Sequence, residues 1–421
     1  MRLFLAFNSL WLVVVAVAVR SSPASAQSPR GFAEFVVEPI DGEPFSGKLV
    51  AMGDWKIGGE PISTKIASMP KTWKITLEGK PPLSGMDLVA IRRHDHEPVA
   101  APSGSQVLLA HGDRIRAIAQ SSTQESLRVN SELLGDVTIP LERVLAIVLN
   151  PPADARSREQ LCRRLSVGKR RQDVLVLVNG DELAGTFTAL SDLTVRLDTA
   201  RGEVSVNRSE VRAIALSTEL LSAPRPTALM AQVVLADGSE LALLDGRMQG
   251  SSLRGRAAFG GDVSMPLEQV VALEFRNGRI TYLSDLAAPD HRHTPFLNTA
   301  YEFELDRSVL GQAISLRGQV FRKGIGVHTR SELTYALAGG ATRFESVVGI
   351  DDESNGQGVV VFRVLLDGKA AWESPPLTGR SPPLPVRVDL GRATKITLVA
   401  DFVNQGDVLG HADWAGARLV H

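Results

Sequence analysis

The chain repeats one pattern of strands and turns at nearly constant spacing, and this repetition limits the folds it can adopt. Three stretches each run an apolar strand into a Gly/Asp turn, continue through a second strand, a polar loop and a third strand, and end on a short apolar strand. The turn glycine and the closing valine keep nearly the same separation, at Gly112 and Val144, Gly180 and Val211, and Gly238 and Val270. This regularity indicates one structural unit used repeatedly.

A fourth, more diverged copy runs from Phe35 to Ile91, with an insertion from Gly58 to Lys71. Short strands with turn signals are typical of a small barrel or a curled antiparallel sheet, and the pattern resembles SH3-like or Sm-like barrels. Units this small bury too little surface to be stable alone, so we expect the copies to pack against one another. The predicted copies cover residues 30–100, 105–150, 174–220 and 230–279.

The repeated Gly/Asp turns have two readings. A Gly-Asp or Asp-Gly pair between two apolar runs supplies the positive φ that a hairpin turn needs. A calcium site at each turn is the alternative, but each turn contributes one or two carboxylates and calcium usually takes six or more oxygens. The pattern therefore favours hairpin turns, and we expect no metal and no cofactor.

A basic linker joins the second and third copies over residues 151–173. Leu161 and Leu165 stand at helical spacing among seven basic residues, which predicts a short amphipathic helix. The basic residues form either a solvated helix face, the favoured reading, or a contact to an anionic polymer or membrane surface. The single cysteine, Cys162, excludes an intrachain disulfide framework and any site built from several cysteines. A net charge of -1 gives no reason to expect nucleic acid as a partner.

The amino terminus reads as a targeting segment. Arg2 precedes an apolar stretch from Leu3 to Val19, and Ala24-Ser-Ala26 supplies a small-residue cleavage pattern. The sequence therefore predicts a signal peptide over residues 1–26, a secreted or periplasmic location in a bacterial cell envelope, and no stable membrane span after cleavage. An uncleaved membrane anchor is the alternative.

Residues 280–421 are rich in predicted strands. Several of these strands alternate apolar and polar residues, which implies one buried and one solvated face. Together with the upstream copies, this predicts an all-β protein in which tandem small barrels or curled sheets are followed by a C-terminal jelly-roll β-sandwich.

Three clusters in this segment combine glycines, histidines, carboxylates and a tryptophan: Lys323-Gly-Ile-Gly-Val-His328, Gly349-Ile-Asp-Asp-Glu353 and His411-Ala-Asp-Trp-Ala415. With Phe344, Val361-Phe362, Asp367-Gly368 and Gly406-Asp407 they form an ordered set. Because it contains this ordered set of residues, the C-terminal third of the chain resembles the NPCBM family of carbohydrate-binding modules. The resemblance implies a jelly-roll β-sandwich that binds sugars, often of galactose type, without cleaving them.

Sugar recognition needs an aromatic face and a few fixed hydrogen-bonding groups. Trp414 can supply the first, and the second can come from His328, Asp351, Asp352, Glu353, His411 and Asp413. Each also has a structural reading: a core tryptophan, satisfied histidines, and a carboxylate run that closes a turn, holds an arginine or binds one calcium. In a regular strand His411 and Asp413 share a face and Trp414 points the other way, so the three cannot all contact one sugar.

Three functions follow from these patterns. The favoured one is an exported, non-catalytic protein whose sandwich binds carbohydrate, with the β repeats as spacer or as a surface for a protein partner. The second is a structural or protein-interaction protein whose sandwich no longer binds sugar. The third is a glycosidase using two carboxylates such as Asp352 and Asp413. A metal hydrolase built on His94 and His96 or on His291 and His293 lacks an evident third ligand.

Overall fold

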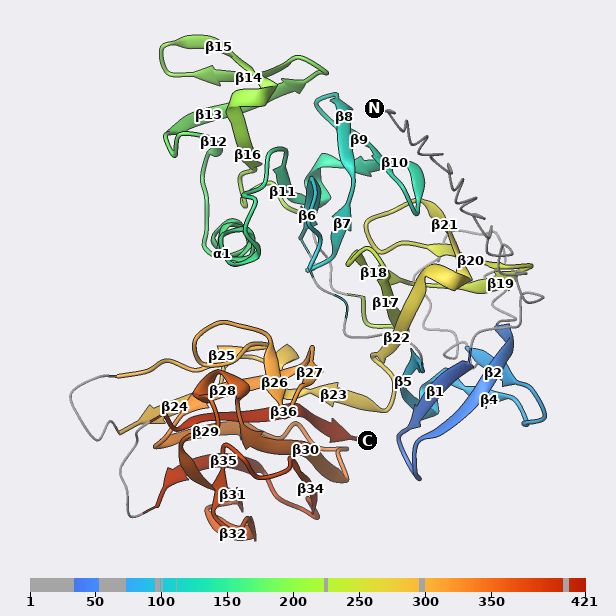
Figure 1. Cartoon of the computed structure of the whole chain (residues 1–421), viewed down its shortest axis with the longest axis vertical. Coiled ribbons are helices and arrows are strands. Elements are labelled where there is room, and N and C mark those ends of the chain that lie inside the picture. The colour runs from blue at the N-terminus through green and yellow to red at the C-terminus, as the bar shows by residue number, and fades with distance from the viewer. Residues whose placement is uncertain are drawn as a thin grey trace, which may run out of the picture. The chain divides into compact units, whose positions relative to one another are not determined.

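The computed structural model describes residues 34–52, 73–94, 99, 101–110, 112–222, 226–294, 300–403 and 409–421 (Figure 1). Nearly all regular structure in these residues is β-strand in antiparallel sheets. The predicted signal peptide and the insertion from Gly58 to Lys71 lie outside the described residues. None of the helices with described positions combines the length and apolar character that a membrane crossing requires.

The second repeat shows the pairing order that the other copies share. Its first strand pairs with the next strand along the chain, and the closing strand returns to pair with the first. A 3₁₀ turn precedes the closing strand. The elements are β6 (Gln106–Leu109), β7 (Arg114–Arg116), β8 (Ile118–Ser122), β9 (Ser126–Ser131), β10 (Gly135–Pro140), η2 (Leu141–Arg143) and β11 (Val144–Val148).

The same order recurs in the other three copies. The first contains β1 (Glu34–Pro39), β2 (Phe45–Met52), β3 (Lys74–Leu77), β4 (Leu83–Ser84), η1 (Gly85–Asp87) and β5 (Leu88–Arg93). The third contains β12 (Asp173–Leu177), β13 (Glu182–Leu190), β14 (Thr194–Thr199), β15 (Gly202–Asn207), η3 (Arg208–Glu210) and β16 (Val211–Ala215). The fourth contains β17 (Met230–Leu235), β18 (Glu240–Leu243), β19 (Arg247–Gln249), β20 (Ser252–Arg256), β21 (Asp262–Pro266), η4 (Leu267–Gln269) and β22 (Val270–Arg276). In each copy the closing strand pairs with the first strand. The likeness to SH3-like or Sm-like barrels stays a prediction.

The repeated turn has the same backbone geometry in three copies. The amides of Gly112, Gly180 and Gly238 each donate to the carbonyl oxygen three residues earlier, at 3.0 Å. Their φ angles are 88°, 98° and 84°, in the left-handed region that glycine adopts at no steric cost. The turn glycines thus have the positive φ that the sequence pattern predicts.

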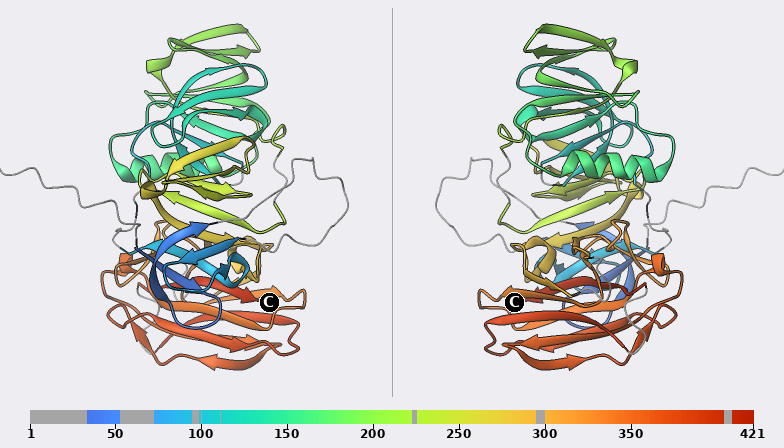
Figure 2. Two further views of the ribbon diagram at one scale, coloured as in Figure 1. Left: turned by 90° about the vertical axis from the view of Figure 1, so that its right-hand side faces the viewer. Right: turned by 90° about the vertical axis from the view of Figure 1, so that its left-hand side faces the viewer.

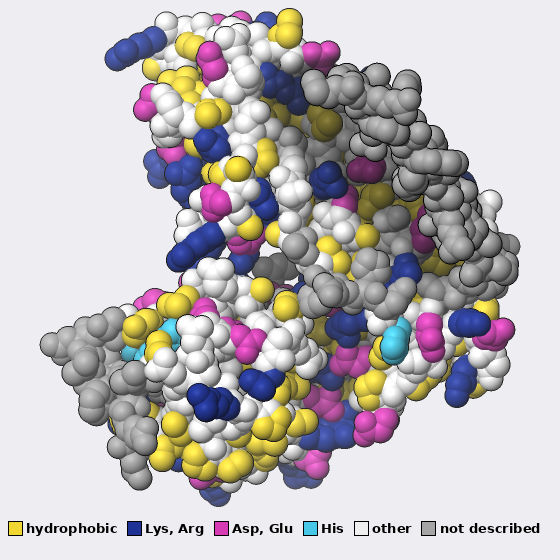
Figure 3. Space-filling view, viewed as in Figure 1, with side chains coloured by type: hydrophobic (Ala, Val, Ile, Leu, Met, Phe, Trp, Pro, Cys, Tyr) yellow, Lys and Arg dark blue, Asp and Glu magenta, His cyan; other side chains and the backbone are white. Residues whose placement is uncertain are grey.

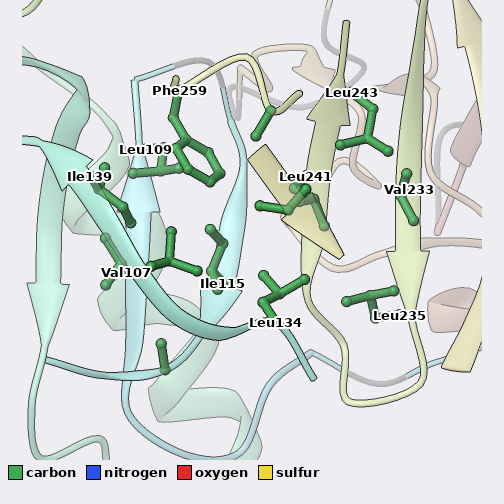
Figure 4. Close-up of a cluster of buried hydrophobic side chains, with 14 of the residues drawn as sticks. Val107, Leu109, Ile115, Leu134, Ile139, Val233, Leu235, Leu241, Leu243 and Phe259 are labelled. Atoms are coloured by element: carbon green, nitrogen blue, oxygen red, sulfur yellow. The ribbon is translucent and has the colours of Figure 1, made fainter. Parts of the chain in front are cut away.

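Copies join through their closing strands. β11 pairs antiparallel with β16, with Ile147 opposite Ile214, and β22 pairs antiparallel with β5, with Leu273 opposite Ile91. A single pairing between β18 and β7 links the fourth copy to the second. One cluster of buried side chains includes members of all four copies, and Figure 4 shows its part around β6, β7, β17 and β18. These ladders confirm that the copies pack against one another.

The predicted linker helix is α1 (Ala155–Ser166). The side chain of Asp154 caps it by accepting a hydrogen bond from the Ser157 amide at 2.8 Å. Leu161, Cys162 and Leu165 form its buried face, packed on small and branched residues of β11 and β16. Burial raises the pKa of the Cys162 thiol, so this cysteine is part of the packing.

The C-terminal segment is a sandwich of two antiparallel sheets, seen as stacked layers in Figure 2. One sheet contains β25 (Glu304–Leu305), β28 (Gly324–His328), β36 (His411–Val420), β30 (Arg343–Ile350) and β34 (Leu384–Asp389), with β23 (Ile280–Tyr282) beside β36. The other contains β24 (Asp290–His293), β29 (Ser331–Ala336), β35 (Lys395–Phe402), β31 (Val359–Leu366) and β32 (Lys369–Glu373), with β33 (Leu377–Thr378) beside β31. A hairpin of β26 (Ile314–Leu316) and β27 (Gln319–Phe321) forms a separate two-stranded sheet, and its Ile314 and Leu316 pack on Ala415 of β36.

Candidate functional site

Trp414 lies in the core of the sandwich. Its side chain is 0% exposed, its ring meets Phe362 edge to face at 5.3 Å between centroids, and it lies 6.2 Å from Phe344. A fully buried indole presents no face to solvent, so the expectation that Trp414 offers its ring to a sugar is corrected. Its contribution is hydrophobic burial between the two sheets.

Alternation along β36 separates Trp414 from its neighbours. Ala412 and Trp414 belong to the core cluster of the sandwich. His411 and Asp413 are buried as well, and alternation along the strand puts their side chains on the opposite face, where Ala415 packs on Ile314 and Leu316. Both faces of this part of β36 are therefore covered.

The carboxylate run after β30 holds neighbouring backbone and hydroxyl groups. Asp351 caps the 3₁₀ turn η6 (Asp352–Ser354) by accepting from the Glu353 amide at 2.9 Å, and it also accepts from the Ser315 amide at 2.9 Å. Asp352 accepts from the Ser315 hydroxyl and from the amides of Arg317 and Gly318. The reading in which these carboxylates close a turn thus accounts for their contacts.

Glu353 and Asp413 are the other two carboxylates among the sequence candidates. Glu353 accepts from the Ser308 hydroxyl at 2.7 Å, and its other oxygen lies 3.1 Å from His411 Nδ1. Burial, and then the neighbouring Asp351, raise the pKa of Asp413 well above its usual value. Because Asp413 is fully buried and Asp352 is held by three donors, the glycosidase pair imagined from the sequence does not flank an open cleft.

Histidines from three strands meet at one end of the sandwich. His328 on β28 stands opposite His411 on β36, with ring centroids 5.5 Å apart. His293 on β24 lies 6.1 Å from His328. Tyr301 stacks on His328, with centroids 4.1 Å apart and ring planes 8° from parallel. We call these four residues the histidine–tyrosine cluster.

Hydrogen bonds fix the orientation of the cluster. The Thr329 carbonyl oxygen lies 2.7 Å from His328 Nδ1 and 3.1 Å from His293 Nε2. The Tyr301 amide donates to His293 Nδ1 at 3.2 Å. His328 and His411 are buried, whereas His293 and Tyr301 are half-buried. The cluster therefore has a rigid inner pair and a partly open outer pair, and Figure 3 shows histidine surface on the sandwich.

Sequence reasoning found two members of the cluster and missed the other two. His291 and His293, considered in the sequence only as a pair of metal ligands, lie on β24 beside β29. Burial lowers the pKa of His291, although Glu302 at 3.6 Å opposes the shift. Within the residues that the structure describes, no group of three His, Cys, Asp or Glu side chains has the arrangement of a metal site. Nothing in the local sequence indicates the contact of His293 with Tyr301.

The arrangement supports binding better than bond cleavage. Tyr301 is half-buried, and an aromatic ring can pack against the apolar C–H surface of a pyranose. His293 lies beside it, with its ring nitrogens facing the Tyr301 amide and the Thr329 carbonyl, and Arg330 is exposed directly after Thr329. A half-open aromatic face with a few polar neighbours is typical of a small-ligand site.

Residues 279–420 match the sequence model of the NPCBM/NEW2 domain. An alpha-1,3-galactosidase B of Akkermansia muciniphila is 31% identical over 119 residues, covering 27% of this chain and 15% of that protein. A protein of Renibacterium salmoninarum named as an endo-alpha-N-acetylgalactosaminidase is 30% identical over 110 residues, covering 26% of this chain and 7% of that protein. The chain thus spans less than a sixth of the length of either relative.

Among solved structures, the CBM51 module from Clostridium perfringens GH95 in complex with methyl-galactose is 28% identical. It matches 34% of this chain and 99% of its own length, with a TM-score of 0.31. The CBM51-2 and INT domains of Clostridium perfringens ZmpB are 25% identical, over 43% of this chain and 36% of theirs, with a TM-score of 0.32.

Proposed function

We propose that this is an exported, non-catalytic carbohydrate-binding protein whose C-terminal sandwich holds a sugar of galactose type at the histidine–tyrosine cluster. The NPCBM/NEW2 match over residues 279–420 supports the ligand class. The four upstream β repeats act as a spacer or as a surface for a protein partner.

One observation carries the choice of site. Tyr301 is half-buried and stacked on His328, which is itself held by the Thr329 carbonyl. A ring held in place by such stacking loses little side-chain freedom when it binds a ligand. Of the sequence candidates, Trp414 and Asp413 are fully buried, and Asp351 and Asp352 already accept two or more hydrogen bonds each.

The proposal includes a galactose-type ligand because the names of two related proteins point there. The Akkermansia relative is named as a galactosidase, and the Clostridium GH95 module was solved with methyl-galactose. A neutral sugar also suits a cluster in which the nearby carboxylates are buried or occupied.

Histidine ring resonances provide the test. The full chain is titrated with methyl-galactoside and, in parallel, with methyl-glucoside, while the ring C–H signals of all histidines are followed by NMR. We expect signals of His293 and His328 to shift with methyl-galactoside at a Kd of about 0.1 to 1 mM, near -5 kcal/mol. His421, which lies 3.1 Å from the Thr281 hydroxyl at the far end of β36, is the internal control.

Two results would count against the proposal. Unchanged His293 and His328 signals across a panel of neutral glycosides would remove the sugar site. Release of reducing sugar from a polysaccharide panel would show catalysis instead.

A second candidate is a structural or interaction protein without sugar binding. It is favoured by the burial of Trp414 and Asp413 and by the use of Asp351 and Asp352 within the fold. This function predicts a flat titration together with capture of a protein partner by residues 34–276.

A further inference from the structure

One segment of the sandwich lies directly on the outer face of β28, β36 and β30. We call residues 306–321 the cover segment. A Cβ placed on Gly326 would lie 2.4 Å from the Arg307 carbonyl oxygen, and one on Gly324 would lie 2.7 Å from Ile314 Cδ1. The glycines therefore allow the cover segment to approach the sheet more closely than any side chain would permit.

Carboxylates make the side-chain anchors of the cover segment on this face. Ser308 donates to Glu353, the Ser315 amide donates to Asp351, and the Arg317 amide donates to Asp352. All three acceptors come from the short stretch after β30. The attachment of the cover segment thus depends on the charge state of a few neighbouring acids.

Asp413 lies beneath the cover segment, where burying an unpaired carboxylate costs free energy. It is 0% exposed, and it stands opposite Gly326 on β28 and Gly349 on β30, neither of which has a side chain to offer. Neither of its oxygens receives a hydrogen bond from an ordinary donor in the described part of the chain. Asp351 lies diagonally across from Asp413, because its amide donates to the His411 carbonyl oxygen at 2.9 Å, and its carboxyl group turns to the same face, where it accepts from the Ser315 amide. Two buried carboxyl groups that share a face in this way need a proton between them.

Among the described residues, the charged neighbours that act most strongly on Asp413 are acids. The acids Asp351, Asp352 and Glu353 surround Asp413, and each raises its pKa. On its own strand, His411 faces Glu353 at 3.1 Å.

The charged groups on the cover segment are Asp306, Arg307 and Arg317. The guanidinium of Arg307 is directed to the Gly311 carbonyl and to Glu159. Asp306 pairs with Lys323 at 2.6 Å, and Lys323 also pairs with Asp285. The backbone amide of Arg317 donates to Asp352.

We propose that Asp351 and Asp413 share one proton in the folded protein, and that this shared proton is a pH-sensitive latch for the cover segment. With the proton present, Asp413 donates to Asp351, and Asp351 keeps its acceptor positions for the Ser315 and Glu353 amides. When the proton leaves, two buried negative charges repel each other, and the Ser315 anchor is lost.

The direction of the pH dependence follows from linkage. The pKa of Asp413 is raised in the folded state, chiefly by burial and then by Asp351. A group of this kind stabilises the fold fully below its unfolded pKa of about 3.9, and the contribution is lost as the pH rises through the folded pKa. The latch is therefore closed in acid and loosens as the solution becomes alkaline.

Hydrogen exchange of single amides tests the latch in the full chain. The Ser315 amide reports on the cover segment, and the Leu398 amide, in the β29–β35–β31 part of the sandwich, is the reference. Protection factors corrected for intrinsic exchange are measured from pH 5 to pH 9. We expect protection of Ser315 to fall by up to about tenfold per pH unit above the folded pKa, the limit for loss of one proton, while Leu398 stays constant.

Asp413→Asn is the decisive variant because it replaces the acid with a neutral group of the same shape that donates to Asp351 permanently. Ser315 protection should then no longer depend on pH. The matched control is Asp367→Asn, because Asp367 is an exposed acid of the same sandwich whose pKa is lowered by Thr394. That control should keep the pH slope of the unsubstituted chain at Ser315.

Three results would overturn the proposal: pH-independent protection of Ser315 in the unsubstituted chain, an unchanged slope in Asp413→Asn, or a change in Ser315 protection on adding EDTA or calcium. The last result would mean that a cation, and not a proton, lies between the two acids. If Asp413→Asn does not fold, the pH dependence of Ser315 protection is compared between the unsubstituted chain and Asp351→Asn. A pH slope in the unsubstituted chain that is lost in Asp351→Asn supports the proposal, and an equal slope in both overturns it.

Discussion

Tyr301 and His328 lie parallel, with ring centroids 4.1 Å apart, although 27 positions separate them in the sequence. The contact joins the segment before β25 to the last residue of β28. It stacks a half-buried aromatic ring on the buried His328.

Tyr301→Ala should weaken sugar binding about tenfold, because one aromatic face contributes about 1.4 kcal/mol. Melting temperature should change little, since the side chain is half-buried. Isothermal titration with methyl-galactoside measures the effect, with His421→Ala as the control at an exposed histidine of the same sandwich. Equal affinity in both variants would place the sugar elsewhere.

Trp414→Ala should destabilise the sandwich by about 3 to 5 kcal/mol, the usual cost of removing a large buried aromatic. The side chain is fully buried against Phe362, so its loss leaves a cavity. Chemical denaturation followed by circular dichroism gives the free energy of unfolding. Trp372→Ala, at a partly buried position of β32, should cost clearly less. A stable Trp414→Ala protein that fails to bind sugar would contradict the core assignment.

Asp113→Ala should destabilise the repeats by about 1 to 3 kcal/mol, because it leaves buried donors without an acceptor. The carboxylate accepts from the Ala242 amide at 3.0 Å and from Gln232 Nε2 at 3.2 Å, and so links the second copy to the fourth. Asp181 occupies the same place in the turn of the third copy but is exposed. Asp181→Ala is therefore the matched control and should change stability by less than about 0.5 kcal/mol. Equal losses in thermal denaturation would mean that the turn, and not the link between copies, matters.

Gly326→Ala should displace the cover segment and cost about 1 to 3 kcal/mol, the usual penalty for overpacking. The new methyl group would lie 2.4 Å from the Arg307 carbonyl oxygen, which is backbone and cannot swing aside. Gly104→Ala is the control, since its Cβ would meet only the flexible Arg116 side chain at 3.4 Å. Faster exchange of the Ser315 amide in Gly326→Ala alone is the expected signature, and wild-type exchange in that variant would refute the close packing.

The strand-and-turn pattern predicted the repeats themselves, but it did not predict which strands of different copies pair. Period-two alternation and the turn glycines are local properties, so β6, β12 and β17 could be placed from the sequence. The ladder between β22 and β5 joins the fourth copy to the first. No local pattern encodes that choice, because any closing strand has the same free backbone groups.

The candidate site was predicted in part. His328 and His411 were chosen from the sequence, and the structure pairs them across β28 and β36. Tyr301 and His293 were missed as members because their contacts with His328 are non-local. Trp414 was misjudged because an aromatic side chain on a strand packs equally well into a core or against a ligand.

By itself the sequence determined the period of the strands, the turns with positive φ, and the landmarks that mark residues 279–420 as an NPCBM/NEW2 match. It also determined that Asp413 and Trp414 point to opposite faces of one strand. Only the tertiary structure decided that both faces are covered, with Trp414 in the core and Asp413 buried on the face of the cover segment. Backbone geometry is local, whereas burial depends on which distant segments pack together.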